Sequence, residues 1–292
     1  MNDTAAVVVT YNRCELLLEN MQCLLSQTRA TDIIVVDNGS TDGTREKLSE
    51  LIESGKISYI NPGENLGGAG GFQLGIKQAV LRGYEYVWIM DDDCMPAPDA
   101  LDKLMQADAE LGEYGFLSSK VLWRDGNICT MNVQRRTLTK PVKKFDKKYI
   151  PVVMASFVSL FVKASVIKKE GLPIKEFFIW TDDWEYTRRI SRKYPCYLVT
   201  DSVVVHKSKS NIGANIANDS ADRLERYNYL YRNDVYLYRR EGFKGFMYEC
   251  VRLTAHFFKI LLKAPDNRRK RIKIMFGGTK AGFGFKPEIE YV

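Results

Sequence analysis

Three consecutive carboxylates, Asp91, Asp92 and Asp93, stand directly after the apolar run Tyr86–Met90. Adjacent carboxylates repel each other unless a cation or protons lie between them. If the run forms a strand, its end places them in one pocket, where a hard divalent ion can join two of them and bridge the phosphates of a substrate. The alternative is an acidic turn in solvent, because charged side chains are mostly exposed.

A histidine and a second acidic pair are further candidates, the first for metal binding and the second for acid–base catalysis. His206 ends the run Val203–Val205 and is one of two histidines. A lone histidine is more often a structural hydrogen-bonding group, but an imidazole also suits a Mn²⁺-type site that needs a third ligand beside two carboxylates. Asp182 and Asp183 precede Trp184 at an expected helix start, where acids commonly cap the helix. The functional alternative is a general base.

The glycine-rich segment Asn65–Gly71 precedes an expected helix. It differs from the dinucleotide-binding fingerprint, since Gln73 stands where a third glycine is needed and the segment follows the third strand rather than the first. A Gly-Lys-Ser/Thr phosphate loop is also missing from the sequence. The small residues therefore indicate either close approach of the backbone to a ligand or a mobile turn.

The elements that must position these residues alternate between strand and helix in the first half. Short β-branched and apolar runs predict four buried strands, and leucine spacing predicts helices between them. Such alternation favours a parallel sheet covered on both faces. Ligands of such sheets gather at the carboxyl ends of the strands. The expected strands are residues 7–10, 33–36, 57–60 and 86–90, and polar residues follow three of them at 10–13, 37–38 and 91–93.

The second half is more mixed. We expect strands at Val152–Val162 and Leu198–Val205, with a helix over Asp182–Tyr194 between them. Residues Asp219–Lys263 show a helical pattern in which aromatic and basic side chains interleave, and the basic cluster Arg268–Lys273 follows. This region is either a packed helical layer or a surface for anionic lipid.

Composition limits the protein class. The chain has 292 residues and a net charge of +7, which favours anionic partners such as nucleotide phosphates. Its six cysteines form no Cys-x-x-Cys pair, so we expect neither a zinc knuckle nor a disulfide framework but a reducing, cytoplasmic environment. No signal peptide and no apolar run of about 20 residues is visible. Peripheral contact with the inner face of the cell membrane is a further expectation.

The ordered set of motifs resembles the family-2 inverting glycosyltransferases. The similarity spans about residues 5 to 240 and implies the GT-A fold: an α/β, Rossmann-like mixed sheet with helices on both faces, here followed by a helical C-terminal region. Bacterial galactofuranosyltransferases are the most similar members, and rhamnosyltransferases come next. The motifs are Val7–Asn12, Val36–Asp42, Asn65–Gly67, Asp91–Asp93, Trp180–Tyr186 and His206.

The resemblance implies a role for each matching residue. Asp183 would be the catalytic base and Asp182 an acidic neighbour that holds the acceptor. Trp180 and Trp184 would stack on sugar faces, although Thr181 separates Trp180 from the Asp pair, unlike the galactofuranosyltransferase pattern. Asp91, Asp93 and His206 would hold Mn²⁺ or Mg²⁺. The nucleotide-sugar pocket would be lined by Thr10, Tyr11, Asn12, Arg13, Asp37, Asn65, Gly67, Gly68, Asp91 and Asp92.

The sequence thus predicts a catalytic domain over residues 1–218 and a basic helical region over 219–292 that serves the acceptor or the membrane. The expected partners are a nucleotide-diphosphate sugar, preferably UDP-galactofuranose, and a glycan or polyprenyl-linked acceptor. A dTDP-rhamnose-dependent rhamnosyltransferase and a nucleotide-sugar-binding protein without catalysis are alternatives. A nucleic-acid-binding module is not expected, because carboxylates repel phosphate and no nucleic-acid-binding motif is present.

Overall fold

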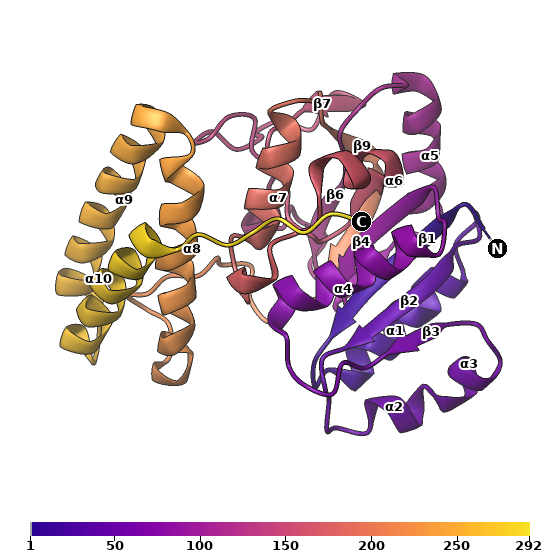
Figure 1. The fold of residues 1–292 in the computed structure, drawn as a ribbon, viewed down its shortest axis with the longest axis horizontal. Helices are drawn as coiled ribbons and strands as arrows, with labels where there is room; N and C mark the ends of the chain where they lie inside the picture. Colours follow the sequence, from indigo (N-terminus) through magenta and orange to yellow (C-terminus); the bar gives the residue numbers. More distant parts are fainter. Residues whose placement is uncertain (1) are drawn as a thin grey trace.

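A nine-stranded mixed sheet forms the centre of the computed structural model, which describes residues 2–292 (Figure 1). Its strand order is β3-β2-β1-β4-β8-β6-β9-β5, and β7 pairs with β9. The helices lie on both faces, as the sequence predicts. The strands are β1 (Thr4–Thr10), β2 (Asp32–Asp37), β3 (Ser58–Ile60), β4 (Tyr86–Asp91), β5 (Cys94–Pro96), β6 (Leu117–Trp123), β7 (Tyr149–Pro151), β8 (Leu160–Lys163) and β9 (Tyr197–His206).

The first half of the chain follows its hydrophobic pattern closely. Strands β1, β2, β3 and β4 are parallel neighbours, and all four were expected. The helix expected between the second and third strands is instead two short helices that meet at Leu48. The helices of this half are α1 (Cys14–Leu25), α2 (Thr44–Lys47), α3 (Ser49–Glu53), α4 (Gly67–Leu81) and α5 (Ala100–Leu111).

The second half adds antiparallel strands, so the sheet is mixed rather than parallel. Strand β8 runs antiparallel to β4, and β6 runs antiparallel to β8. The expected strand Val152–Val162 is wrong over most of its length, because only Leu160–Lys163 enters the sheet. The residues before it are buried by side-chain packing: Phe157 packs edge-on against Phe72 and Tyr186. The apolar residues of this segment therefore indicate that it is buried, and a buried segment does not have to be a strand.

Two apolar layers sandwich the sheet. Along β1, Val7 and Val9 face one layer, while Ala6 and Val8 face the other. This alternation explains why the strand is apolar at every position. The first layer includes side chains of α4, α6 (Ala164–Glu170) and α7 (Asp182–Ser191), and the second includes those of α1 and α5. The remaining short 3-10 helices are η1 (Thr130–Asn132), η2 (Lys175–Phe177) and η3 (Ala221–Arg226).

Three helices form a separate layer beside α7: α8 (Tyr227–Arg239), α9 (Gly242–Lys263) and α10 (Arg268–Gly284) (Figure 1). The helical C-terminal region is therefore confirmed, and the basic cluster 268–273 is the first part of α10. One member of that cluster, Arg271, is buried and donates to the Asp219 carbonyl oxygen at 2.9 Å. Glycines at Gly278 and Gly282 allow α10 to lie directly against α8, since a Cβ at Gly282 would stand 2.6 Å from Val235 Cβ.

The last residues leave this layer and return to the sheet domain (Figure 1). The Leu172 amide donates to the Glu290 carbonyl oxygen at 2.8 Å, and Lys77 pairs with the Glu290 carboxylate at 2.6 Å. The chain therefore crosses twice between the two parts. Among residues 2–292, no helix combines the length and the apolar character that a membrane span requires.

Candidate active site

The predicted site residues of the first half lie at the carboxyl edge of the parallel strands. In register, Thr10 at the end of β1 stands beside Asp37 at the end of β2, and Val9 stands beside Asp91 at the end of β4. Because these strands are parallel, their carboxyl ends lie at the same edge of the sheet, and residues far apart in sequence meet there. The sequence predicted this meeting for each of the three strands.

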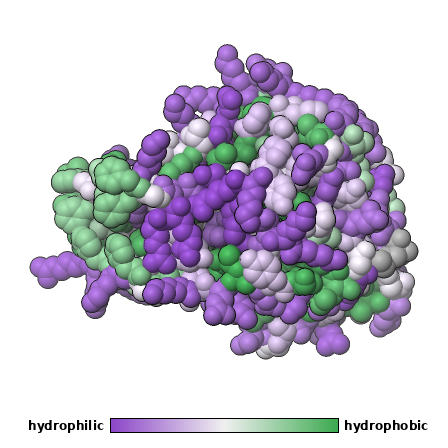
Figure 2. Space-filling model, turned by 45° about the horizontal axis from the view of Figure 1, so that its top comes forward, coloured by the Kyte–Doolittle hydropathy of each residue, from purple (hydrophilic) through white to green (hydrophobic). Residues whose placement is uncertain are grey.

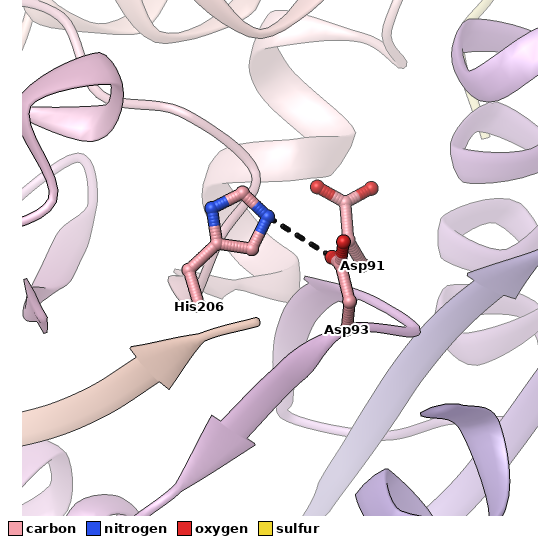
Figure 3. Close-up of side chains that lie close together, drawn as sticks. All are labelled: Asp91, Asp93 and His206. Carbon is pink, nitrogen blue, oxygen red and sulfur yellow. Dashed lines mark hydrogen bonds and ion pairs between the residues drawn. The ribbon is translucent and has the colours of Figure 1, made fainter. Parts of the chain in front are cut away.

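Asp91, Asp93 and His206 form one compact group (Figure 3). Antiparallel pairing sets Cys94 of β5 opposite His206 of β9, which brings the imidazole next to the turn that contains Asp93. His206 Nε2 lies 3.0 Å from Asp93 Oδ1, and one ligand atom from each of the three residues falls within 4.8 Å of the others. The three predicted metal ligands therefore converge.

The charges of this group suit a divalent cation. Burial, together with the nearby Asp93 charge, raises the pKa of Asp91 to about 7, although the His206 charge opposes this shift. Burial alone would raise the pKa of Asp93, but the hydrogen bond and charge of His206 outweigh it and the pKa is lowered. Burial lowers the pKa of His206, yet its bond to Asp93 prevails and the pKa rises to about 10. A half-buried carboxylate, a buried carboxylate and an imidazole nitrogen match the ligands of Mn²⁺-type sites.

A residue that sequence reasoning missed orients the imidazole. Asn132 Oδ1, which can only accept, lies 2.7 Å from His206 Nδ1, so Nδ1 carries a proton and Nε2 faces the carboxylates. The amide is itself held, since its Nδ2 donates to Ser156 Oγ at 3.0 Å. Partners of this kind fix the tautomer of a metal-binding histidine. No local motif marks Asn132, because its role depends on the fold of the segment between β6 and β7.

Asp92 points to a different set of partners. Its carboxylate accepts from Thr10 Oγ1 at 2.7 Å and from Arg13 at 3.2 Å, and Arg13 also reaches Asp93 at 2.7 Å. Burial raises the pKa of Asp92 to about 6, against the attraction of Arg13. Half of the Arg13 side chain stays exposed. The guanidinium thus balances part of the acidic cluster while remaining open to an anionic ligand.

Hydrogen bonds join the loops after β1 and β2. Asn12 adopts a left-handed conformation (φ 53°), and its Oδ1 accepts from the Thr41 amide at 2.8 Å. Asp37 is buried and accepts from the Ser40 amide at 2.8 Å and from the Tyr59 hydroxyl, another partner that the sequence did not reveal. Beside these loops, Tyr11 leaves 46% of its surface exposed. The predicted nucleotide residues therefore lie together at one edge.

The glycine-rich segment is used mainly for contacts within the protein. A Cβ at Gly67 would stand 2.2 Å from the Phe178 carbonyl oxygen, and one at Gly71 would stand 2.6 Å from Val9 Cγ1. Asn65 Oδ1 accepts from the Gly67 amide at 2.8 Å. A Cβ added at Gly68, in contrast, would have no neighbouring atom within 4 Å. The close backbone approach expected from the sequence is thus largely an approach to β1 and to the segment before α7.

The acidic pair on α7 lies near the metal ligands. Burial, then the charge of Asp182 and the charge of Asp91, raise the pKa of Asp183 well above its usual value. Asp183 Oδ1 accepts from the Trp184 amide at 2.7 Å, which orients the carboxylate. Burial raises the pKa of Asp182 to about 6, although backbone amides at the helix start oppose this shift. The base predicted from the sequence therefore lies close enough to Asp91 to feel its charge.

The two tryptophans pack against protein on at least one face. Trp180 lies against Tyr227, with ring centroids 5.0 Å apart, and Arg135 lies 4.1 Å from the centroid of the Trp184 ring. Both side chains are half-buried. Stacking of a sugar on either ring remains a prediction, which now has to use the ring face or edge that the protein leaves open.

Comparison with known proteins agrees with this geometry. The profile described as Glycosyl transferase family 2 matches residues 5–169, more than half of the chain. The chain belongs to glycosyltransferase family 2. It is 28% identical over 296 residues to galactofuranosyltransferase GlfT1 of Mycobacterium tuberculosis, an alignment that covers 96% of each chain.

Solved structures show the same fold at low sequence identity. The mannosyltransferase PcManGT of Pyrobaculum calidifontis, in complex with GDP-Man and Mn²⁺, aligns over 96% of this chain and 87% of its own, with a TM-score of 0.61 and 17% identity. S. aureus TarS 1–349 in complex with UDP aligns over 97% and 72%, with a TM-score of 0.57 and 15% identity. The expected GT-A fold is thereby confirmed.

The contact between Asn132 and His206 predicts an effect on metal affinity. Asn132→Leu keeps the size of the side chain but removes the oxygen that orients the imidazole, so Mn²⁺ should bind about 10–100-fold more weakly. Asn132→Asp retains an acceptor oxygen and should keep most of the affinity. Calorimetric titration of Mn²⁺ in the presence of UDP, with thermal unfolding of both variants as a check on folding, measures the difference. Equal affinity in Asn132→Leu and the parent would show that Asn132 does not support the site.

Proposed function

We propose that this glycosyltransferase transfers galactofuranose from UDP-galactofuranose to a hydroxyl of a glycan, with inversion at the anomeric carbon. The observation that carries the reaction is the convergence of Asp91, Asp93 and His206 at one edge of the sheet, with Asp183 close enough for the Asp91 charge to raise its pKa. Similarity to GlfT1 over 96% of both chains supports the donor. A catalytic base facing a cation site is the arrangement that a single displacement needs.

In this mechanism the residues of the chain bind the donor, orient the acceptor and remove the proton of the acceptor hydroxyl. The oxygen of the acceptor hydroxyl bonds to the anomeric carbon while Asp183 accepts the proton of that hydroxyl. The bond from the anomeric carbon to the diphosphate oxygen breaks in the same step. A divalent ion held by Asp91, Asp93 and His206 would stabilise the leaving diphosphate as a Lewis acid. Arg13, half-exposed beside this group, would add positive charge next to the phosphates. Asp182, at the start of the same helix, would accept a hydrogen bond from another acceptor hydroxyl.

The raised proton affinity of Asp183 fits this role. An ordinary aspartate is a weak base, whereas a general base works best when its pKa approaches the working pH. Burial beside Asp182 moves the pKa of Asp183 in that direction. Its Oδ1 atom is held by the Trp184 amide, so the Oδ2 atom is left to accept the proton.

The outer surface of the C-terminal helices supports a lipid-linked acceptor. Four of the five tyrosines of α8 are buried and Tyr229 is half-buried, so the interleaved pattern there reflects packing. Exposed apolar side chains instead lie along one stripe of α9, with two more on α10. They are Phe243, Phe246, Met247, Val251, Phe258, Leu261, Leu262, Phe276 and Phe283.

Positive charge surrounds this stripe. Residues 242–284 contain ten lysines and arginines but only Glu249 and Asp266 as acids. Glu249 is buried against Arg252, and Asp266 pairs with Arg271, so neither offsets the exposed cations. Figure 2 shows apolar surface gathered at one end of the molecule, with hydrophilic side chains at its edge. An apolar stripe edged by lysine and arginine suits a bilayer with anionic head groups. We infer that the enzyme works peripherally at the cytoplasmic face of a membrane, where a polyprenyl-linked glycan would be presented.

A donor panel tests the reaction directly. With Mn²⁺ present and an oligosaccharide acceptor, UDP-galactofuranose should release nucleotide faster than UDP-glucose, GDP-mannose or dTDP-rhamnose. Excess chelator should abolish release, and Mn²⁺ or Mg²⁺ should restore it, because the diphosphate loses its Lewis acid. Preference for dTDP-rhamnose would replace the proposed donor, and full activity in chelator would contradict the metal site. Binding of nucleotide sugars with no turnover would indicate a non-catalytic protein.

The Asp183→Asn variant separates catalysis from donor binding. The amide keeps the size of the carboxylate but cannot accept a proton, so transfer should slow at least about 10²-fold. Calorimetry should show UDP and Mn²⁺ binding close to the parent. Asp201→Asn, which changes an exposed acid on β9, is the matched control and should leave transfer unchanged. If Asp183→Asn transfers normally but binds donor poorly, the base must be another acid such as Asp182.

Vesicle sedimentation tests the membrane surface. Vesicles with anionic lipid should bind the protein at low salt and release it as salt rises, since exposed charges are screened beyond about 10 Å at 0.1 M. Phe258→Ser combined with Leu262→Ser should weaken binding because it removes apolar area from the α9 stripe. Leu81→Ser, at a residue 61% exposed on α4, controls for apolar loss elsewhere. Equal binding to neutral vesicles, or no change in the α9 variant, would contradict this surface.

A further inference from the structure

The segment that leads into α7 has an unusual backbone. Phe178, Trp180 and Thr181 all have positive φ angles, with values of 62°, 64° and 67°. Bulky residues seldom adopt them, and β-branched residues such as threonine almost never do. Such a conformation persists only where surrounding contacts impose it. Asp182 follows directly, so whatever holds this segment also sets the direction in which the acidic pair enters the site.

Asn233 of α8 supplies one such contact. Its side-chain Nδ2 lies within hydrogen-bond distance of three carbonyl oxygens of the segment: those of Phe177 at 3.0 Å, Ile179 at 3.2 Å and Trp180 at 2.9 Å. The side chain is fully buried. An amide group is suited to this position because it can donate two hydrogens, whereas a carboxylate would repel the carbonyls.

Asp234, the next residue, supplies the second contact. Thr181 is the residue before the first turn of α7, where a threonine hydroxyl usually accepts from a backbone amide of the helix. Here the Thr181 hydroxyl instead donates to Asp234 Oδ1 at 2.7 Å. Asp234 is fixed in turn by Arg252 of α9 at 2.7 Å, and Arg252 pairs with Glu249. The hydroxyl that could cap α7 is thus used to attach α7 to the C-terminal helices.

The same segment also touches the glycine-rich loop. The Phe178 carbonyl oxygen accepts from the Ala69 amide at 3.2 Å, and it occupies the space that a Cβ of Gly67 would fill. The Phe178 ring stacks on Tyr229 of α8, with ring centroids 4.9 Å apart. The strained segment is therefore held between the proposed donor loop and α8.

We propose that Asn233 and Asp234 are positioning residues for glycosyl transfer: they hold the Phe178–Thr181 segment, with its three positive φ angles, and so aim Asp182 and Asp183 at the acceptor. This inference rests on the proposed role of Asp183. It gives the C-terminal helices a part in catalysis that is separate from any contact with a membrane. Small displacements of a reacting group are enough to lower a rate about 10²-fold.

A matched pair of substitutions at Thr181 tests the proposal. Thr181→Val keeps the shape and the β-branch but removes the hydroxyl, and Thr181→Ser keeps the hydroxyl. Thr181→Val should lower kcat at least about 10-fold. The donor KM and the Kd for UDP and Mn²⁺ should stay within about twofold of the parent values, a difference of about 0.4 kcal/mol. Thr181→Ser should restore kcat. A purely structural hydroxyl would lower the unfolding temperature of Thr181→Val without this separation of kcat from KM.

Asp234→Ala removes the same hydrogen bond from the other side. If Thr181 and Asp234 act through one contact, the double variant should be no slower than the slower single variant. Additive losses of kcat would contradict the proposal, and so would a Thr181→Val variant with normal kcat or with an equal loss of donor affinity.

Hydrogen exchange keeps this test independent of the reaction proposed above. The amides of residues 177–184 should exchange faster in Thr181→Val than in the parent, and Thr181→Ser should resemble the parent. If the parent transfers no sugar from any donor, the proposed function fails, while faster exchange in Thr181→Val alone would still support the hold on the segment. Unchanged exchange would overturn the positioning role whatever the activity.

Discussion

Repulsion among carboxylates is the constraint on which the rest of the site depends. Asp91, Asp92 and Asp93 are consecutive, and Asp183 lies close enough for the Asp91 charge to raise its pKa. Folding must bring these charges together in a place where little water can screen them, which is costly unless each charge has a partner. The fold supplies partners from distant segments: His206 for Asp93, Arg13 and Thr10 for Asp92, and backbone amides for Asp182 and Asp183. A divalent cation would complete this compensation, which explains why the cluster suits a diphosphate substrate.

The mixed sheet is what allows such partners to meet. Parallel strands alone would bring together the residues that follow β1, β2 and β4, but His206 lies more than a hundred residues further on. It joins them because β9 pairs antiparallel with β5, the short strand that directly follows the acidic turn. The predicted metal ligands thus depend on an antiparallel addition to a parallel core. The same second half contributes Asn132, whose amide orients the imidazole.

Features that depend on a local sequence pattern could be predicted, and features that depend on contacts between distant residues could not. Buried strands with β-branched residues, polar residues at their ends and the acidic pair at a helix start are local patterns, so β1, β2, β4, β9 and α7 could be predicted together with the residues that converge. The segment Val152–Ser159 could not, because its apolar residues are buried by tertiary packing that no period of two or 3.6 describes. Asn132, Tyr59, Asn233 and Asp234 were missed because single polar residues gain their roles only from partners far away in sequence. The glycine-rich loop was recognised, but its glycines serve contacts with Val9 and Phe178 that only the structure reveals.

Those glycines connect the two halves of the proposed reaction. Gly67 lies against the Phe178 carbonyl oxygen, and its own carbonyl accepts from Asn38 at 3.0 Å, at the end of β2. The loop expected to contact the donor is therefore bonded on one side to the edge of the sheet predicted to bind the nucleotide and on the other to the segment that precedes the proposed base. Because that segment is strained and is held by α8, a shift of the C-terminal helices would be transmitted to Asp183 and to the donor loop together. The sequence predicts that the chain divides at residue 218 into a catalytic part and a C-terminal part. If the proposals above hold, the two parts share the reaction, because the proposed base belongs to the first part and is held in place by the second.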